Sequence, residues 1–294
     1  MFHTLVIMKN RVAQSDDEIE GDYRLVGEHK VLNSVDRIVA ATPAELAQLQ
    51  WLYEMDIRRI VVIPPGVDTG KFYPIPQDEA LEFIGVPPCN QMLLFVGRIE
   101  PLKGLDVLIE AIALMRRDGT LERTPFCLSV IGGDPDVSPE LMSAEMTRVQ
   151  TLLEQYGLEE FVAFLGKRSQ DTLPYYYSAA EAVVVPSHYE SFGMVALEAM
   201  ACGTPVVASQ IGGLAYLVQD GITGFTVPVD EPQALAERLA TLLADEELRS
   251  RMSVNSISVA QDYAWEKVVN RLVDVYEELL EGASGKHTGD RTGM

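Results

Sequence analysis

Two glutamates, Glu190 and Glu198, flank a predicted helix start and are the residues best placed to do chemistry. The apolar, β-branched run 182–186 predicts a buried strand, and a helix is expected to open at 191–193 and to stop at Gly203. Glu190 lies in the loop before this helix, and Glu198 lies within it. Backbone N–H groups at a helix start lack partners inside the helix and favour anions. A diphosphate with hydroxyl groups at both ends, as in a nucleotide sugar, fits such a pair of carboxylates.

Four backbone N–H groups at this helix start are the candidate phosphate donors, namely those of Phe192, Gly193, Met194 and Val195. Arg98 and Lys103 follow another predicted strand, where parallel sheets bind their ligands. Two cations there can neutralise a diphosphate, and the planar guanidinium of Arg98 can bridge two oxygen atoms. The plainer alternative is ordinary surface charge for the two cations and solvated turn or helix positions for the two glutamates.

Apolar runs alternate along the chain with helical patterns, which is typical of parallel sheets with helices on both faces. The predicted strands are residues 37–41, 59–63, 92–97, 127–132, 161–166, 182–186, 205–209 and 224–228. Helical spacing of apolar residues marks 105–115 and 234–243, and Thr42, Pro43 and Glu45 give a capping box at another helix start. The predicted fold class is therefore α/β, with ligands expected at the carboxyl ends of the strands.

The chain is acidic and has the composition of a globular protein. Its 294 residues allow one large or two ordinary domains, and hydrophobic residues make up 47% of them. The net charge of −21 repels nucleic acid and anionic lipid, so neither is expected as a partner. No apolar stretch approaches the ~18 residues of a membrane span. The first residues do not have the pattern of a secretory signal peptide.

The three cysteines, Cys89, Cys127 and Cys202, include no CxxC pair. Cys127 and Cys202 stand in apolar contexts and are expected to be reduced core residues, which fits a cytoplasmic protein. The sequence has no cluster of His and Cys with metal-ligand spacing. It also lacks the dinucleotide-binding, P-loop and serine-hydrolase motifs, which weakens those three classes of function.

Two domains joined by a connector are expected. Pro64-Pro65-Gly66 opens a proline-rich stretch, so residues 1–75 are assigned to a partial first domain and the connector. Residues 76–262 hold at least six predicted strands and are expected to form a complete doubly wound domain. Residues 263–281 predict a final amphipathic helix, and the polar residues 282–294 predict a disordered tail.

A series of motifs runs in order through residues 59–228. The motifs are Pro64-Pro-Gly-Val-Asp68, Val96-Gly-Arg-Ile-Glu-Pro-Leu-Lys-Gly104, Val130-Ile-Gly-Gly133, Val162-Ala-Phe-Leu-Gly166, Glu190-Ser-Phe-Gly193, Glu198-Ala-Met-Ala-Cys-Gly-Thr-Pro205, Gly212-Gly213 and Asp220-Gly-Ile-Thr-Gly224. In order and spacing this series resembles the nucleotide-binding half of the retaining glycosyltransferases of the GT4 family.

The resemblance implies the GT-B architecture, here a complete C-terminal Rossmann-like domain, a partial N-terminal Rossmann-like domain and a last helix that crosses back to the first domain. It implies transfer of a sugar from a nucleoside-diphosphate sugar, with a UDP-sugar favoured, to an acceptor hydroxyl with retention of configuration. Glu198 would accept the ribose hydroxyls, and Glu190 would contact the transferred sugar or stabilise its positive charge. Gly133 and Arg168 join the donor-binding residues, with the backbone at Arg168 meeting the base.

No metal and no cofactor is expected, because fixed cations and helix N–H groups stabilise the departing diphosphate. Asp134-Pro135-Asp136 matches the DxD metal signature of the other large glycosyltransferase fold, but it follows a double glycine and is interpreted as a turn. The expected partners are a nucleotide sugar and a small-molecule or glycan acceptor.

The first residues resemble, more weakly, the end of an acceptor domain. The nearest resemblance is to the branch that glycosylates phosphorylated acceptors, which includes inositol-phosphate N-acetylglucosaminyltransferase and sucrose-phosphate synthase. By this resemblance Thr4, Lys9 and Arg24 would bind the acceptor, and His3 would lie beside the reacting sugar. Members of the family carry many more residues before the position of Met1, so an N-terminally truncated chain or an internal start is expected.

Two other classes of function stay open at this point. A chain with half a cleft could bind a nucleotide sugar without turning it over, and binding without transfer would reveal this. Paired carboxylates also occur in glycosidases, which need a protonated acid at a set distance from a second carboxylate. Hydrolysis of a glycoside that lacks a nucleotide would favour the glycosidase hypothesis.

Overall fold

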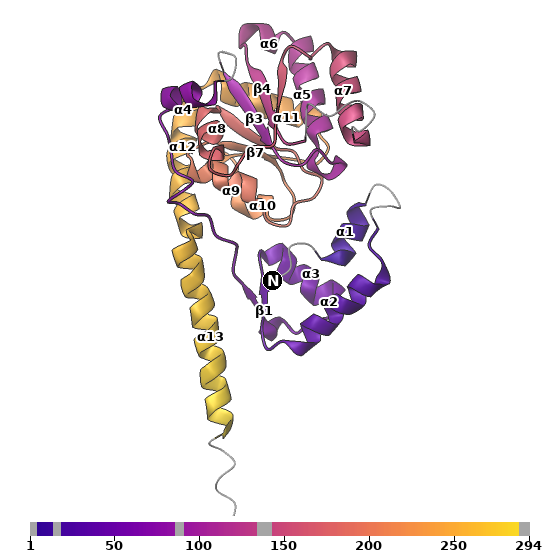
Figure 1. Cartoon of the computed structure of the whole chain (residues 1–294), viewed down its shortest axis with the longest axis vertical. Coiled ribbons are helices and arrows are strands. Elements are labelled where there is room, and N and C mark those ends of the chain that lie inside the picture. Colours follow the sequence, from indigo (N-terminus) through magenta and orange to yellow (C-terminus); the bar gives the residue numbers. More distant parts are fainter. Residues whose placement is uncertain (1–4, 14–18, 86–90, 134–142, 288–294) are drawn as a thin grey trace, which may run out of the picture. The chain divides into compact units, whose positions relative to one another are not determined.

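The computed structural model describes residues 5–13, 19–85, 91–133 and 143–287. The chain forms two compact units (Figure 1): unit 1 comprises Met1–Gly66 and Asp262–Met294, and unit 2 comprises Val67–Gln261. Each unit has a hydrophobic core of its own. The polypeptide therefore leaves unit 1 once, builds unit 2, and returns to unit 1 with its last helix.

Unit 2 is built on a six-stranded parallel sheet, and unit 1 holds a two-stranded parallel sheet. The strands are β1 (Ile38–Ala40), β2 (Ile60–Val62), β3 (Met92–Val96), β4 (Cys127–Ile131), β5 (Val162–Gly166), β6 (Ala182–Val185), β7 (Val206–Ser209) and β8 (Gly224–Val227). All eight coincide with predicted strands, so the α/β fold class is confirmed. Every residue of β6 is buried, as expected for a strand with helices on both faces.

The strand order of the larger sheet is β5-β4-β3-β6-β7-β8, so the chain builds outward from β3 in one direction and from β6 in the other. β3 and β6 are parallel neighbours, with Leu93 opposite Ala182. Where strand order reverses in this way, a crevice opens at the carboxyl ends of the two central strands, and ligands of doubly wound folds bind there.

The helices of unit 2 are α4 (Gln77–Ile84), α5 (Leu105–Arg117), α6 (Thr120–Arg123), α7 (Ala144–Tyr156), α8 (Leu173–Ala179), α9 (Met194–Ala201), α10 (Leu214–Leu217), α11 (Pro232–Ala244) and α12 (Glu246–Ala260). Strand side chains alternate between the two faces of the sheet. Leu93, Leu128 and Val184 form one core with α5, α7 and α11, whereas α8 contacts β3 and α9 contacts β6. In the part of the chain that the structure describes, no helix combines the length and the apolar character needed to cross a membrane.

Unit 1 contains α1 (Val6–Val12), α2 (Asp22–Ser34), α3 (Pro43–Leu52) and α13 (Trp265–His287) together with β1 and β2. α3 begins as predicted, because Thr42 Oγ1 accepts a hydrogen bond from Glu45 N at 3.1 Å. The Glu45 carboxylate reaches back to Ala41 N at 2.5 Å, one residue before the N-cap. Thr42 and Glu45 thus satisfy two backbone donors at this helix start.

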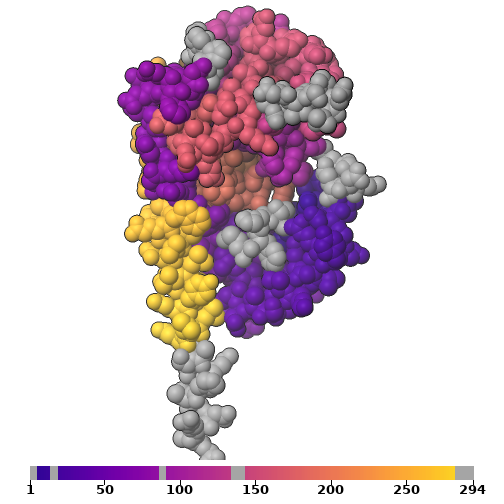
Figure 2. Space-filling view, in the orientation of Figure 1, coloured from indigo at the N-terminus to yellow at the C-terminus, as the bar shows by residue number. Residues whose placement is uncertain are grey.

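α13 is amphipathic, as predicted, but part of its apolar side is exposed. The exposed residues are Trp265, Val269, Val273, Tyr276 and Leu280. Figure 2 shows α13 as the yellow segment. Close packing is seen in the first turns, where Val268 is buried and a β-carbon on Gly66 would lie 2.8 Å from the Trp265 ring. The first turns of α13 therefore meet the end of the N-terminal segment.

The boundary between the units lies at Gly66–Val67, earlier than the predicted end of the connector at residue 75. Val67 and Phe72 are buried, and the Phe72 ring lies 6.2 Å from the ring of Tyr177 in α8. The part of the proline-rich stretch that follows Gly66 is therefore packed into unit 2.

The C-terminal helix continues past the predicted start of the tail at residue 282, because α13 ends at His287. The segment 282–287 contains no proline, so nothing in its covalent structure forces the helix to stop at Gly282. The rest of the predicted tail, 288–294, lies outside the described residues.

Two cysteines differ in state. Cys127 is disulfide-bonded, which corrects the prediction of a reduced core residue. It is the first residue of β4 and is only half-buried, whereas the four residues that follow it in the strand are buried. Cys202 is a free, buried thiol, as predicted.

Candidate functional site

The loops that follow β3 and β6 are in direct backbone contact at the point where the strand order reverses. His188 N donates a hydrogen bond to Leu102 O at 2.9 Å. Gly104 has φ +65°, and a β-carbon there would lie 2.1 Å from the Pro186 carbonyl oxygen. Only glycine therefore fits at this position, where the chain turns into α5. The two loops form a single base for the side chains that they carry.

Lys103 and Glu190 meet across this junction, although they were predicted from separate motifs. Lys103 Nζ and Glu190 Oε2 are 2.8 Å apart, and the side chains are 26% and 18% exposed. The pair is within reach of solvent but partly shielded, which strengthens its electrostatic interaction. A cation held in this way can be shared with an anionic ligand that arrives beside it. The structure thus brings a predicted donor-binding cation against a predicted catalytic carboxylate.

The double glycine after β7 holds the turn that carries Glu190. A β-carbon on Gly212, which has φ +51°, would lie 1.8 Å from the Glu190 carbonyl oxygen, and one on Gly213 would lie 2.2 Å from Phe192 Cα. Gly213 N also donates a hydrogen bond to Glu190 O at 3.1 Å. The two glycines therefore allow two backbone segments to touch, and this contact sets the position of the Glu190 turn.

The start of α9 is not neutralised by its own side chains. Gly193 is the N-cap with φ +107°, no side chain caps the helix, and its first turn contains no acidic residue. Phe192 is buried just before the helix, whereas Met194 is exposed. The backbone N–H groups of Met194 and Val195 therefore begin a helix whose positive end can face an anion.

Glu198 is nearly buried in α9, at 9% exposed, and Tyr177 OH donates a hydrogen bond to its Oε2 at 2.8 Å. Burial raises the pKa of Glu198, whereas the Tyr177 hydrogen bond and the charge of Lys71 lower it. The ring of Phe72 also packs against the ring of Tyr177. A carboxylate held in this way has a fixed direction and is suited to accept hydrogen bonds from hydroxyl groups.

Sequence reasoning missed three residues that support this carboxylate, namely Lys71, Phe72 and Tyr177. Lys71 Nζ also pairs with Asp171 Oδ1 at 2.6 Å. The signal that could have found two of them is a lysine and a phenylalanine three and four residues after the Pro64–Asp68 motif, since a plain linker needs neither. Tyr177 gave no such signal, because its contact with Glu198 depends on how α8 packs against α9.

We expect Tyr177→Phe to destabilise unit 2 by about 1–2 kcal/mol, because a buried carboxylate loses a hydrogen-bond donor. The change should also raise the pKa of Glu198 further, since the Tyr177 hydrogen bond now lowers it. Urea unfolding measures the cost, with Tyr276→Phe on the exposed side of α13 as the matched control. Equal unfolding midpoints for the two variants would show that the Tyr177 hydroxyl contributes nothing.

The other predicted donor residues follow β3, β4 and β5 and include two exposed side chains. Arg98 is 77% exposed, with its NH1 2.6 Å from Glu100 Oε1. Arg168 is exposed after β5, and its Nε donates to Tyr176 OH at 2.8 Å. Gly133, with φ +64°, is tightly packed, since a β-carbon would lie 2.7 Å from an isoleucine side chain of the β3 loop. The loops after β3 and β4 are therefore in contact.

Of the predicted acceptor residues in unit 1, Lys9 and Arg24 come together. Lys9 Nζ and Arg24 NH1 both lie close to Glu20 Oε1, at 2.5 Å and 2.9 Å. The third predicted acceptor residue, Thr4, lies outside the described residues, and so does His3, which was predicted to lie beside the reacting sugar.

The residues that the structure describes contain no group of three or more His, Cys, Asp or Glu side chains able to hold a metal ion. The DxD-like segment 134–136 lies outside the described residues.

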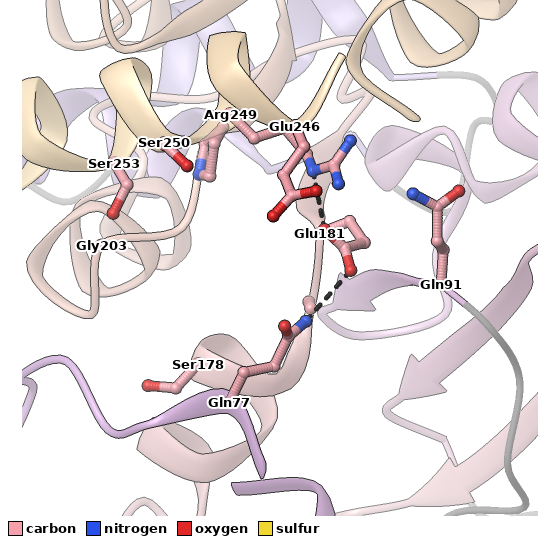
Figure 3. A pocket seen from close by; sticks show the side chains of 11 residues that line it. Gln77, Gln91, Ser178, Glu181, Gly203, Glu246, Arg249, Ser250 and Ser253 are labelled. Carbon is pink, nitrogen blue, oxygen red and sulfur yellow. Dashed lines mark hydrogen bonds and ion pairs between the residues drawn. The ribbon is translucent and has the colours of Figure 1, made fainter. Parts of the chain in front are cut away.

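A separate pocket of about 520 Å³ lies at the opposite edge of the sheet, where β3 and β6 begin (Figure 3). Arg249 Nε pairs with Glu181 Oε2 at 2.7 Å, and Gln77 Nε2 donates to Glu181 Oε1 at 3.0 Å. The ion pair of this pocket is therefore satisfied within the protein. We interpret the pocket as a structural junction of α4 and α12 with the sheet, separate from the site at the carboxyl ends of the strands.

Residues 77–259 match the model of a protein family described as glycosyl transferases group 1. The chain belongs to the group 1 glycosyltransferase family. The matched residues include β3 to β8 and the junction of Lys103 with Glu190. The predicted glycosyltransferase resemblance is thus confirmed for most of unit 2.

Similarity to glycosyltransferases also extends into unit 1. The chain is 40% identical over 280 residues to a D-inositol 3-phosphate glycosyltransferase of Actinosynnema mirum. It is 39% identical over 279 residues to D-inositol 3-phosphate glycosyltransferase 2 of Catenulispora acidiphila. Each alignment covers 95% of this chain, but 66% and 64% of the relatives. The chain therefore spans about two thirds of the length of the curated relatives it matches.

Solved glycosyltransferase structures share the fold. Sucrose-phosphate synthase from Thermosynechococcus elongatus gives a TM-score of 0.82 at 33% identity, over 96% of this chain and 67% of that one. HepE from Anabaena, in complex with UDP and glucose, gives a TM-score of 0.75 at 24% identity, over 95% of this chain and 70% of that one. The likeness to HepE shows the fold alone. With the observed strand order, these matches confirm the predicted GT-B fold class.

Proposed function

We propose that this chain carries the donor site, and part of the acceptor site, of a retaining glycosyltransferase that moves a sugar from a nucleoside-diphosphate sugar to an acceptor hydroxyl. The observation that carries this proposal is the junction at the reversal of strand order, where Lys103 and Glu190 pair beside the start of α9. A cation, a carboxylate and an unneutralised helix end are the groups that suit the reacting end of a sugar diphosphate.

The donor nucleotide is proposed to bind along this junction. Arg98, Lys103 and the first N–H groups of α9 bind the diphosphate, and Glu198 accepts hydrogen bonds from the ribose hydroxyls. The fixed direction of the Glu198 carboxylate supports this role, because Tyr177 holds one of its oxygen atoms. A uridine nucleotide is favoured, since HepE, which shares the fold, has been solved in complex with UDP.

The proposed chemistry depends on charge stabilisation at both ends of the breaking bond. As the bond from the anomeric carbon to the diphosphate oxygen breaks, negative charge grows on the diphosphate, where Lys103 and the α9 start stabilise it. Glu190 stabilises the positive charge that grows on the sugar ring. The acceptor hydroxyl forms the new bond on the same face, and its proton passes to the leaving phosphate. We propose no metal or cofactor, because these fixed groups supply the stabilisation.

The acceptor is proposed to be a phosphorylated polyol or sugar. Relatives named for D-inositol 3-phosphate, and a structural neighbour named sucrose-phosphate synthase, support this class. Lys9 and Arg24 supply two adjacent cations for the phosphate. Thr4 is proposed to join them, and His3 to lie beside the reacting sugar.

Calorimetric titration of the full chain with UDP, ADP and GDP tests the donor site. We expect UDP to bind in the micromolar range and Glu198→Ala or Lys103→Met to weaken it roughly 10–100-fold, the effect of one charge-assisted hydrogen bond. Arg98→Ala should cost less, because Arg98 is the most exposed of these side chains. Binding without transfer to any acceptor would favour a nucleotide-sugar-binding module, and binding of no nucleotide would reject the donor site.

We expect Glu198→Gln to make unit 2 more stable while it weakens nucleotide binding. Because the pKa of Glu198 is raised, the folded state holds the proton more tightly than the unfolded chain. The stability from this group is therefore present at acid pH and is lost as the pH rises from 4.5 through the folded-state pKa. A neutral amide removes that loss, so the Tm at neutral pH should rise by about 2–4 °C, the shift given by ~1 kcal/mol.

Thermal unfolding of Glu198→Gln at acid and neutral pH checks this trade-off. The gain in Tm should disappear at acid pH, where the wild-type carboxyl is already protonated. Glu82→Gln, on the exposed side of α4, changes the net charge equally and should show neither effect. A lower Tm for Glu198→Gln at neutral pH would contradict the expectation.

A further inference from the structure

Lys9 and Arg24 converge on a single carboxylate oxygen in unit 1. Lys9 Nζ lies 2.5 Å, and Arg24 NH1 lies 2.9 Å, from the same atom, Glu20 Oε1. The Lys9, Arg24 and Glu20 side chains are 36%, 30% and 23% exposed, so a solute can reach them. The Lys9 hydrogen bond lowers the pKa of Glu20, which keeps this carboxylate ionised at neutral pH. An anionic oxygen thus already lies between two cations proposed to bind an acceptor.

The backbone of Glu20 is fixed independently of its side chain. Asn10 Nδ2 donates a hydrogen bond to Glu20 O at 3.0 Å, and Glu20 N donates one to Asn10 Oδ1 at 2.8 Å. These bonds join the Asn10 side chain on α1 to the main-chain atoms of Glu20 and do not involve the Glu20 carboxylate. The carboxylate can therefore turn away by rotation about its own side-chain bonds, without movement of a helix.

The positive charges of Lys9 and Arg24 are balanced by two carboxylates only while the Glu20 side chain points toward them. Arg24 Nε also lies 3.4 Å from Glu28 Oε1. Glu28 is buried, and it accepts hydrogen bonds from Val6 N at 3.1 Å and from Tyr53 OH. These hydrogen bonds fix the Glu28 carboxylate between α1 and Tyr53, so it is not free to turn toward Lys9. With two cations and two carboxylates in the cluster, outward rotation of Glu20 leaves one positive charge in excess for an incoming anion.

We propose that Glu20 is the specificity-determining residue of the acceptor site. Its carboxylate occupies the position of the acceptor's phosphate until a phosphorylated acceptor displaces that carboxylate. This inference rests on the function proposed above. A phosphate ester offers several oxygen atoms and can replace both ion pairs of Glu20 with charge-assisted hydrogen bonds. A neutral polyol cannot replace them, so the cost of breaking the ion pairs selects against unphosphorylated acceptors.

The competing interpretation is that Glu20 only ties α1 to α2. In that case, loss of its charge would loosen unit 1 without improving the binding of any anion. The two interpretations therefore differ in the sign of the change in phosphate affinity for a Glu20 variant.

The test is a calorimetric titration of the full wild-type chain and of Glu20→Gln with D-inositol 3-phosphate, inorganic phosphate and unphosphorylated inositol. Glutamine keeps the shape and removes the charge. The Kd of both phosphate probes should fall roughly tenfold, since two part-exposed ion pairs, each worth a factor of up to about five, no longer compete. The affinity for unphosphorylated inositol should not increase.

Matched variants make the result decisive. Glu82→Gln on α4 in unit 2 removes one negative charge elsewhere and should leave the phosphate Kd unchanged, whereas Lys9→Met should raise it. An unchanged or higher phosphate Kd in Glu20→Gln, or no phosphate binding by either protein, would overturn the proposal.

A parallel UDP titration separates this inference from the proposed donor site. Glu20→Gln should leave the Kd of UDP unchanged, because Lys103 and Glu198 belong to unit 2. If wild type fails to bind UDP, the donor site is rejected, and the phosphate titrations still decide the role of Glu20.

Discussion

Gly212→Ala is expected to destabilise unit 2 by at least about 3 kcal/mol and to abolish nucleotide binding. The new β-carbon would lie 1.8 Å from the Glu190 carbonyl oxygen, and no side-chain rotation can relieve a clash with the backbone. Either the loop after β7 or the turn that carries Glu190 must move. Movement of that turn separates Glu190 from Lys103, so stability and the proposed donor site should be lost together.

Gly221→Ala is the matched control for this change. Gly221 also has a left-handed conformation, with φ +74°, but a β-carbon there would have nothing within 4 Å. It should cost only ~1–2 kcal/mol of conformational strain and leave the UDP affinity unchanged. Urea unfolding and UDP titration of both variants check the expectation. Equal losses would mean that backbone strain, and not the contact with Glu190, accounts for the effect.

Arg249→Met is expected to destabilise unit 2 by about 2–4 kcal/mol, because it leaves a largely buried carboxylate without its cation. Arg249 and Glu181 are only 13% and 14% exposed, and their Nε and Oε2 atoms are 2.7 Å apart. Arg249 NH1 also donates to the carbonyl oxygens of Leu242 and Leu243 near the end of α11, at 2.6 Å and 3.0 Å. The loss therefore combines the ion pair with two hydrogen bonds to carbonyl oxygens, although Leu242 O keeps the Asp245 N–H at 3.4 Å and Leu243 O keeps the Gln91 side chain at 2.9 Å.

A double variant separates the ion pair from the rest of that loss. Glu181→Met together with Arg249→Met should recover much of the stability, since an apolar pair can replace a buried ion pair at little cost. Arg251→Met, which breaks an exposed pair with Glu247, should change the free energy of unfolding by less than ~1 kcal/mol. Urea unfolding measures all of these variants. A double variant as unstable as Arg249→Met would show that the carbonyl contacts, and not the ion pair, carry the effect.

Local pattern was enough to predict the strands of unit 2 and its helices α5, α9 and α11. Strands such as β6 are continuous β-branched runs that end at glycine or proline, and helices such as α5 repeat apolar residues at spacings of three and four. These signals lie within a few residues of one another, so the sequence reports them directly.

Pairings between distant residues could not be predicted in the same way. Lys103 and Glu190 were each selected for their chemistry, but their contact exists because β3 and β6 are neighbours, and strand order is not written in any local pattern. The same reason hides the hydrogen bond from Tyr177 to Glu198. Cys127 was mispredicted because apolar neighbours in sequence did not place its side chain inside the core.

In unit 1 the sequence led to the two cations of the cluster but not to the carboxylate that pairs with them. Lys9 and Arg24 were predicted from a resemblance, whereas Glu20 belongs to an acidic stretch in which no single carboxylate stands out. Its position between the two cations depends on the Asn10 hydrogen bonds, which only the folded backbone reveals.

Residues 67–76 determine where a chain of this kind can be cut and joined to another without loss of the contacts around Glu198. The family match begins at residue 77, but Phe72, which packs on Tyr177, and Lys71, whose charge lowers the pKa of Glu198, both precede it. A recombination event or an engineered fusion that joins chains at residue 77 would keep Glu198 and replace the side chains that support it. A junction at Val67 would transfer Glu198 together with Lys71 and Phe72. Residues 67–76, which resemble a linker in sequence, therefore belong structurally with the proposed donor site.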